Sequence, residues 1–100
     1  MKFYYAIYQQ GHELIVAVCD DDTLEGTFYC AERGIKIDVK KSFYGKKLGQ
    51  KEDILSYMKD ATILNLVGKK IVGIALSEGL ISRECILEIG DTLHAQRVKM

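Results

Sequence analysis

The sequence predicts a single α+β domain, with a mostly antiparallel sheet, an N-terminal hairpin, two central helices packed on the sheet and a C-terminal hairpin. The prediction rests on the order of the patterns, because strand-like segments lie at both ends of the chain and helical segments lie between them. Such grouping is typical of α+β domains, whereas strict strand–helix alternation would favour a parallel sheet. At 100 residues the chain can build one hydrophobic core, so we assign residues 1–100 to one domain.

The N-terminal hairpin is predicted from two strand-like segments. Residues 3–8 read FYYAIY and residues 13–19 read ELIVAVC, and aromatic and β-branched residues of this kind favour strands. Gly11, between them, can take the positive φ that a tight hairpin turn requires. The second segment is apolar on both of its faces, which predicts a central strand that is covered on both sides.

Three further strands are predicted. Residues 35–39 (IKIDV) alternate between apolar and polar side chains, which indicates a half-buried strand. Residues 85–89 (CILEI) and 93–98 (LHAQRV) are expected to form the C-terminal hairpin, with a tight turn at Gly90 and Asp91.

Two central helices are predicted from Lys51 onward. Apolar residues recur at helical spacing, but the two stripes that they form are rotated relative to each other, so we place a break near Asp60. The second helix would start with Asp60 as its N-cap and end at Gly79. Gly68 would lie inside this helix, where a small residue lets a neighbouring backbone approach closely. A phosphate-binding loop at Gly68 is less favoured, because it needs another glycine earlier in the loop and a preceding strand.

Composition excludes several classes of protein. There are 14 Lys and Arg residues against 14 Asp and Glu residues, so no net field draws the chain toward nucleic acid or an anionic membrane. No apolar stretch near the start has the length of a signal peptide or a transmembrane span, so we expect no membrane partner. The three cysteines are typical of reduced thiols in a cytoplasmic protein.

The cysteines give no sign of a metal site. Cys19, Cys30 and Cys85 are widely spaced and odd in number, which is typical of reduced thiols. With His94 they would offer an acceptable set of zinc ligands, but they lack the paired spacing of known zinc sites. We therefore predict no metal and no cofactor.

Residues 40–51 (KKSFYGKKLGQK) form a strongly basic segment within a neutral chain. Lysines interleaved with aromatic residues suit contacts with phosphates and stacking on bases, which predicts binding to RNA. The alternative is a solvated loop that Phe43 and Tyr44 anchor to the core. The candidate binding residues of this segment are Lys40, Lys41, Tyr44, Lys46 and Lys47.

A second candidate site involves the last predicted strand. His94 and Gln96 alternate with their neighbours and therefore share one face of that strand. A histidine beside a glutamine can form a small polar site, and histidine titrates near neutral pH. Asn65, on the polar side of the second predicted helix, is the residue that could face them. The alternative is a pair of surface side chains that bond to a neighbouring loop.

Five short stretches run through nearly the whole chain in a recognisable order: GTF at residues 26–28, FYG at 43–45, ATILNLVG at 61–68, EGLI at 78–81 and HAQ at 94–96. In these stretches the sequence resembles an archaeal family known as domain of unknown function 424. The resemblance implies a small, archaeal, cytoplasmic α+β protein with a loose link to translation and ribosome-related genes, and it brings no established activity. This chain departs from the family before the histidine, where it has Gly90-Asp91 and Leu93 in place of a Gly-Gly and a proline.

The sequence supports three hypotheses about function. The first is a non-enzymatic binding module for RNA or a ribonucleoprotein of the translation machinery, with the four lysines on phosphates and Tyr44 stacked on a base. The second is a small-ligand-binding protein or small enzyme centred on His94, Gln96 and Asn65, which requires these three to converge. The third is a structural or oligomerising protein whose aromatic N-terminal strand forms an interface. No specific reaction is indicated, and we favour a protein without catalytic activity.

Overall fold

The structure is a computed structural model that describes residues 1–99, and it confirms the predicted α+β class. The strands are β1 (Lys2–Gln10), β2 (Glu13–Asp20), β3 (Thr27–Cys30), β4 (Ile35–Asp38), β5 (Lys47–Gln50), β6 (Ile63–Val67), β7 (Ile86–Ile89) and β8 (Thr92–Val98). The helices are α1 (Lys41–Tyr44), α2 (Lys51–Asp60) and α3 (Lys69–Ser77), with 3-10 turns η1 (Ala31–Arg33) and η2 (Arg83–Cys85).

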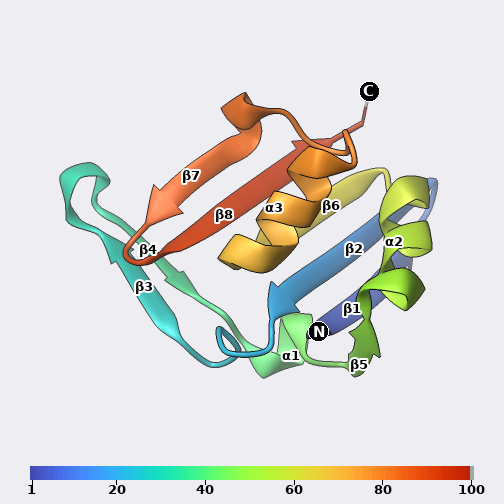
Figure 1. The fold of residues 1–100 in the computed structure, drawn as a ribbon, viewed down its shortest axis with the longest axis horizontal. Coiled ribbons are helices and arrows are strands. Elements are labelled where there is room, and N and C mark those ends of the chain that lie inside the picture. Colours follow the sequence, from blue (N-terminus) through green and yellow to red (C-terminus); the bar gives the residue numbers. More distant parts are fainter. Residues whose placement is uncertain (100) are drawn as a thin grey trace.

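Six strands form one twisted sheet in the order β5-β1-β2-β6-β8-β7 (Figure 1). The pair β2–β6 is parallel and all other neighbours in this sheet are antiparallel, as predicted for a mostly antiparallel sheet. Both predicted hairpins are confirmed. They are β1–β2, which turns at Gly11 with φ of 60°, and β7–β8, which turns at Gly90 with φ of 61°.

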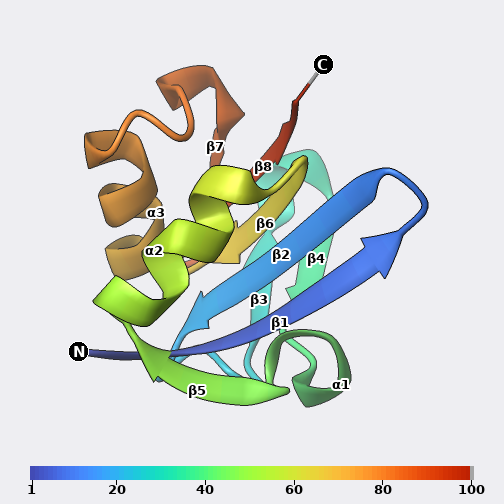
Figure 2. The same ribbon diagram turned by 90° about the vertical axis from the view of Figure 1, so that its right-hand side faces the viewer.

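The helices α2 and α3 cover one side of this sheet, which we call the helix face (Figures 1 and 2). Alternate strand residues point to this side, and they meet the apolar stripes of both helices in one continuous core. Its largest fully buried side chains include Phe3, Ile54, Met58, Leu64, Leu66 and Ile71. This core is what the alternating strand patterns and the helical stripe of residues 51–60 encode.

The opposite side, which we call the hairpin face, is covered differently. A separate two-stranded sheet, β3–β4, and the single-turn helix α1 pack on part of it (Figure 2). The smaller core beneath them contains Ala17, Cys19, Val39, Tyr44 and Val67. Because strand β2 is covered on both faces, the prediction of a central strand from its two apolar faces is confirmed.

The prediction of a long second helix is wrong. Residues 63–67 form the central strand β6, and only the part from Lys69 onward is helical. The apolar residues fit helical spacing by coincidence, because a strand that is buried on both faces is apolar at nearly every position. Leu64 and Leu66 face the helices, whereas Val67 faces the hairpin.

Gly68 is therefore a strand-to-helix turn and no part of a helix interior. Its φ of 127° is a conformation that L side chains rarely adopt, and a Cβ there would lie 2.6 Å from both carboxylate oxygens of Asp20. That carboxylate accepts hydrogen bonds of 2.9 Å from the backbone N–H groups of Lys70 and Ile71, so it caps α3 from the end of strand β2. A strand does precede Gly68, but the N–H groups that a phosphate would need are occupied.

The C-terminal ends of the two long helices are tied to strand β8. The end of α3 at Gly79 is confirmed, with φ of 73° and the hydrogen bond from Leu80 N to Ala75 O that defines a Schellman ending. Arg97 donates hydrogen bonds to the carbonyl oxygens of Leu80 (2.8 Å) and Ala61 (2.7 Å).

Within residues 1–99, no helix combines the length and the apolar character needed to cross a bilayer.

Candidate functional site

A polar cluster lies on the hairpin face, where three distant parts of the chain meet. The Tyr44 hydroxyl donates a hydrogen bond of 2.5 Å to Oδ1 of Asn65, and His94 Nε2 lies 3.2 Å from the same oxygen. The pairing of β6 with β8 places Gln96 directly opposite Asn65. The expected convergence of Asn65, His94 and Gln96 is thus present, although Asn65 belongs to a strand and not to a helix.

The hydrogen bonds fix the orientation of the Asn65 side chain. An amide oxygen can only accept, so the contact with His94 is a hydrogen bond when the imidazole carries its proton on Nε2. The amide nitrogen of Asn65 and Nδ1 of His94 have no partner among the described residues, and neither is sealed from solvent. They offer a donor and an acceptor beside the exposed carboxamide of Gln96.

Burial keeps the ionisable groups of this cluster uncharged near neutral pH. It raises the pKa of Tyr44 and lowers the pKa of His94, because each charged form would lose hydration. Burial also raises the pKa of the neighbouring Cys19 thiol to about 11, so this cysteine is not an activated nucleophile. The arrangement is suited to hydrogen bonding and holds no strongly nucleophilic group.

The four candidate lysines of the basic segment are all exposed. Lys40 and Lys41 lie at the start of α1, and Lys46 and Lys47 follow it. Within residues 1–99, no carboxylate is within salt-bridge distance of any of them. The nearby Lys36, by contrast, has its Nζ 3.8 Å from Oδ2 of Asp38. The segment therefore presents a local positive charge that the chain itself does not neutralise.

The expected stacking role of Tyr44 is wrong. Its side chain is only 5% exposed, and its ring packs against the hairpin-face core, so a base cannot lie on it. The alternative interpretation, in which Phe43 and Tyr44 anchor the loop, matches the structure. Next to the basic segment, the partly accessible aromatic residues are Tyr8 and Phe43, which are both half-buried and stack with ring centroids 5.4 Å apart.

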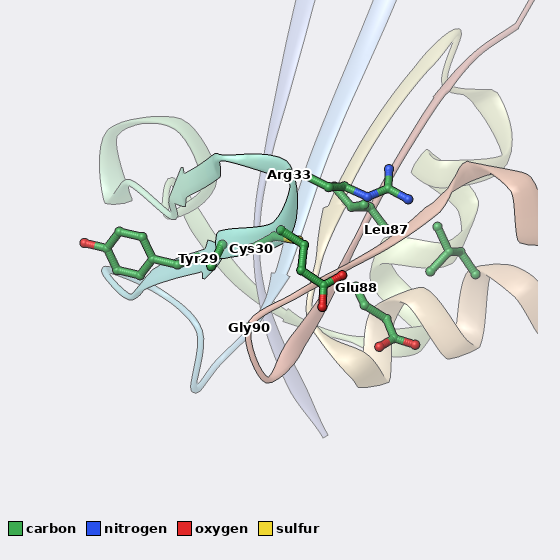
Figure 3. A pocket seen from close by; sticks show the side chains of 9 residues that line it. Tyr29, Cys30, Arg33, Leu87, Glu88 and Gly90 are labelled. Carbon is green, nitrogen blue, oxygen red and sulfur yellow. The ribbon is translucent and has the colours of Figure 1, made fainter.

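A groove lies between the tip of the β3–β4 hairpin and strand β7 (Figure 3). It has a volume of about 580 Å³, and its walls include Arg33, Leu87 and Glu88. The ring of Tyr29 points away from it. Leu87 is paired with His94 across the β7–β8 ladder, so the groove adjoins the polar cluster.

Sequence reasoning missed two features of this region. It did not link Tyr44 to Asn65, and it did not identify Asp20 as the cap of a distant helix. For the link between Tyr44 and Asn65, the available signal was a tyrosine directly after a phenylalanine inside a charged segment, a pattern that indicates a buried anchor. No signal in the sequence identifies the partner of Asp20. Within residues 1–99, no three side chains of the metal-ligating types come together.

Comparisons with known proteins agree with this fold. The crystal structure of an uncharacterized conserved protein from Methanopyrus kandleri is similar, with a TM-score of 0.79 and 19% identity over 100% of this chain and 95% of that chain. A likeness at this identity shows the fold alone. A comparison with curated proteins finds no match. The family described as protein of unknown function (DUF424) matches residues 8–100, which is nearly the whole chain. The chain therefore belongs to the DUF424 family.

Proposed function

We propose that the protein is a non-enzymatic binding module for RNA, alone or within a ribonucleoprotein of the translation machinery. The observation that carries the proposal is the position of the lysines. Lys40 and Lys41 are exposed at the start of α1, which packs on the face that also bears Asn65, Gln96 and His94. Lys46 and Lys47 are exposed just after α1, at the edge of the sheet, where the pairing of Lys47 with Tyr5 directs the Lys47 side chain toward the helix face.

The lysines supply attraction to phosphates. A single strand of RNA carries one negative charge per nucleotide, and unpaired lysines along its path release counterions when it binds. The chain has no net charge, and residues 40–47 hold four exposed lysines and no acidic residue, so the attraction is strongest at this segment. A neutral protein with one basic surface favours a defined orientation of the strand over general adhesion to polyanions.

The sheet face supplies contacts to bases. Bases that lie across a sheet can stack on aromatic rings, and the partly accessible candidates beside the lysines are Tyr8 and Phe43. The side chains of Asn65, Gln96 and His94 offer donors and acceptors to base edges. The buried Tyr44 does not contact a base; its hydroxyl donates a hydrogen bond to Oδ1 of Asn65 and so holds the Asn65 side chain in one orientation.

Fluorescence anisotropy with a labelled single-stranded RNA of mixed sequence tests the proposal. If four phosphates are contacted, the logarithm of the affinity falls with the logarithm of salt concentration with a slope of about −3. The double variant Lys40→Ala/Lys41→Ala is expected to bind more weakly and to bring the slope to about −1.4.

The matched control removes the same charge elsewhere. Lys69→Ala/Lys70→Ala changes two adjacent exposed lysines at the start of α3 whose side chains form no salt bridge within residues 1–99, and it is expected to leave affinity and slope nearly unchanged. Equal losses in the two double variants would show adhesion without a defined surface. Absence of binding at low salt would rule out RNA as the ligand.

A small uncharged ligand is the second candidate, because the required convergence of Asn65 and His94 is met at 3.2 Å. The four nucleosides, which carry no phosphate, are suitable probes. In this case NMR signals of the Asn65 side-chain amide would shift on addition of one nucleoside, and the shift would persist at high salt. Shifts that appear only with RNA, and that vanish at high salt, would exclude this candidate.

A further inference from the structure

The helix face of the sheet is not fully covered. Strand β7 is at the edge of the sheet, and α3 lies over β2, β6 and β8. A groove of about 340 Å³ remains between α3 and β7. Its walls are mostly apolar. They include Val72 and Leu76 from the helix, and Ile86 and Leu93 from the strands. This groove is on the side of the sheet opposite to the proposed RNA surface, and it is independent of that proposal.

No contact within the monomer requires a glycine at position 73. It is the central residue of α3, it is exposed, and it lines the groove. A Cβ at this position would meet no heavy atom of residues 1–99 within 4 Å, and the backbone has no positive φ that would require glycine. Glycine inside a helix destabilises it relative to alanine, and the missing side chain leaves the surface of α3 open to close approach by another backbone.

The groove has a positively charged side chain at one end and a negatively charged side chain at the other. Strand β7 runs antiparallel to α3 (Figure 1), so Arg83 lies toward the C-terminal end of the helix and Glu88 lies toward its N-terminal half. Both side chains are exposed, and neither forms a salt bridge within residues 1–99. With one positive and one negative group, the groove has no excess charge that would attract RNA.

We propose that two copies of this chain associate through the groove about a two-fold axis that passes near Gly73. A two-fold axis makes an interface self-complementary, so each group meets its counterpart twice. The axis reverses the direction of the groove in the second copy. Arg83 of one copy therefore lies beside Glu88 of the partner subunit, and the same contact occurs a second time with the two copies exchanged. The two α3 helices then run antiparallel, and their close approach is made possible by Gly73. This surface differs from the N-terminal strand, which lies inside the sheet between β5 and β2.

Sedimentation velocity over a wide range of protein concentrations tests the proposal by charge reversal. Arg83→Glu and Glu88→Arg each place like charges together twice, and each is expected to weaken the dimer by about a hundredfold. The double variant Arg83→Glu/Glu88→Arg restores both pairs and is expected to dimerise like the wild type. An equal mixture of the two single variants is expected to form a heterodimer, because unlike charges meet again at both contacts.

A change at Gly73 separates the interface from the fold. Gly73→Gln adds a long side chain where the monomer has open space, so the monomer is expected to remain folded by circular dichroism while the dimer is lost. A wild-type chain that is monomeric at every concentration would overturn the proposal. So would a dimer that both single charge reversals leave intact, or a double variant that fails to recover. RNA binding by the Lys40/Lys41 surface is measured separately, so failure of one proposal does not decide the other.

Discussion

The two faces of the central sheet are built in different ways. The helix face carries a continuous apolar core under α2 and α3, and its polar groups serve structure, as Asp20 and Arg97 do when they bind helix ends. The hairpin face has a smaller core under α1 and β3–β4, and beside it lie hydrogen-bonding groups that are open to solvent. Apolar packing is therefore concentrated on one side of the sheet, and the other side carries polar groups that remain open to solvent.

The strand-to-helix turn on the helix side provides the strongest test of this difference. Gly68→Ala is expected to destabilise the fold by about 3 kcal/mol or more, because it combines an unfavourable φ with a clash against Asp20. Urea unfolding measures the loss. The control is Gly73→Ala in the same helix, which meets open space and is expected to stabilise the monomer by about 0.5–1 kcal/mol. An unchanged free energy of unfolding for Gly68→Ala would show that the turn can adjust to the added methyl group, and would contradict this prediction.

Removal of the charged cap is expected to have the next largest effect. Asp20→Asn can keep only one of the two hydrogen bonds to α3, and the unpaired N–H group costs about 2 kcal/mol. Burial raises the pKa of Asp20 above 3.8, so its protonation contributes stability that is fully present below pH 3.8 and is lost as pH rises through the folded-state pKa.

Chemical denaturation at several pH values measures both effects of Asp20→Asn. The stability difference between wild type and variant should grow as pH falls toward 3.8. A difference that shrinks over this range would mean that the helix N-terminus outweighs burial and lowers the pKa.

The hairpin face should tolerate change better. Tyr44→Phe removes one hydrogen bond and keeps the ring in its core position, so a loss of about 1 kcal/mol is expected together with a freer Asn65 side chain. Denaturation measures the first effect, and NMR signals of the Asn65 amide report the second. Tyr29→Phe, at a side chain that is 63% exposed, is the control with no expected effect. A loss as large as that of Gly68→Ala would contradict the distinction between the faces.

The smallest expected effect concerns His94. Burial lowers its pKa below 6.5, so its contribution to stability is present above pH 6.5 and is lost as pH falls through the folded-state pKa. NMR titration of the ring protons should give a midpoint below 6.5, and His94→Gln should lose less stability than the wild type over that range. A midpoint at or above 6.5 would show that the ring is hydrated or paired with a charge.

The hairpins and helix α2 could be predicted because their signals are local. Alternating patterns, Gly11 and Gly90 at turns, and a single apolar stripe decide these elements within short windows. Strand β6 could not be predicted in the same way, because a run that is apolar on both sides fits either period. Its state is set by strands β2 and β8, which pair with it from distant parts of the chain.

The candidate site was predicted in part for a related reason. His94 and Gln96 share a strand, so their common face follows from the sequence. Asn65 meets them only through the β6–β8 register, and its convergence was predicted from the wrong element. An aromatic residue among lysines can be an anchor or a stacking platform, and burial of Tyr44, which depends on contacts far away in the chain, decides between the two.

The most direct test of the division between the faces is an NMR titration of isotope-labelled protein with single-stranded RNA at low salt. Chemical-shift changes are predicted to cluster on Lys40, Lys41 and the side-chain amides of Asn65 and Gln96, and to be absent from α2 and α3. Changes that centre on the two long helices, or no changes at all, would contradict the assignment of binding to the hairpin face.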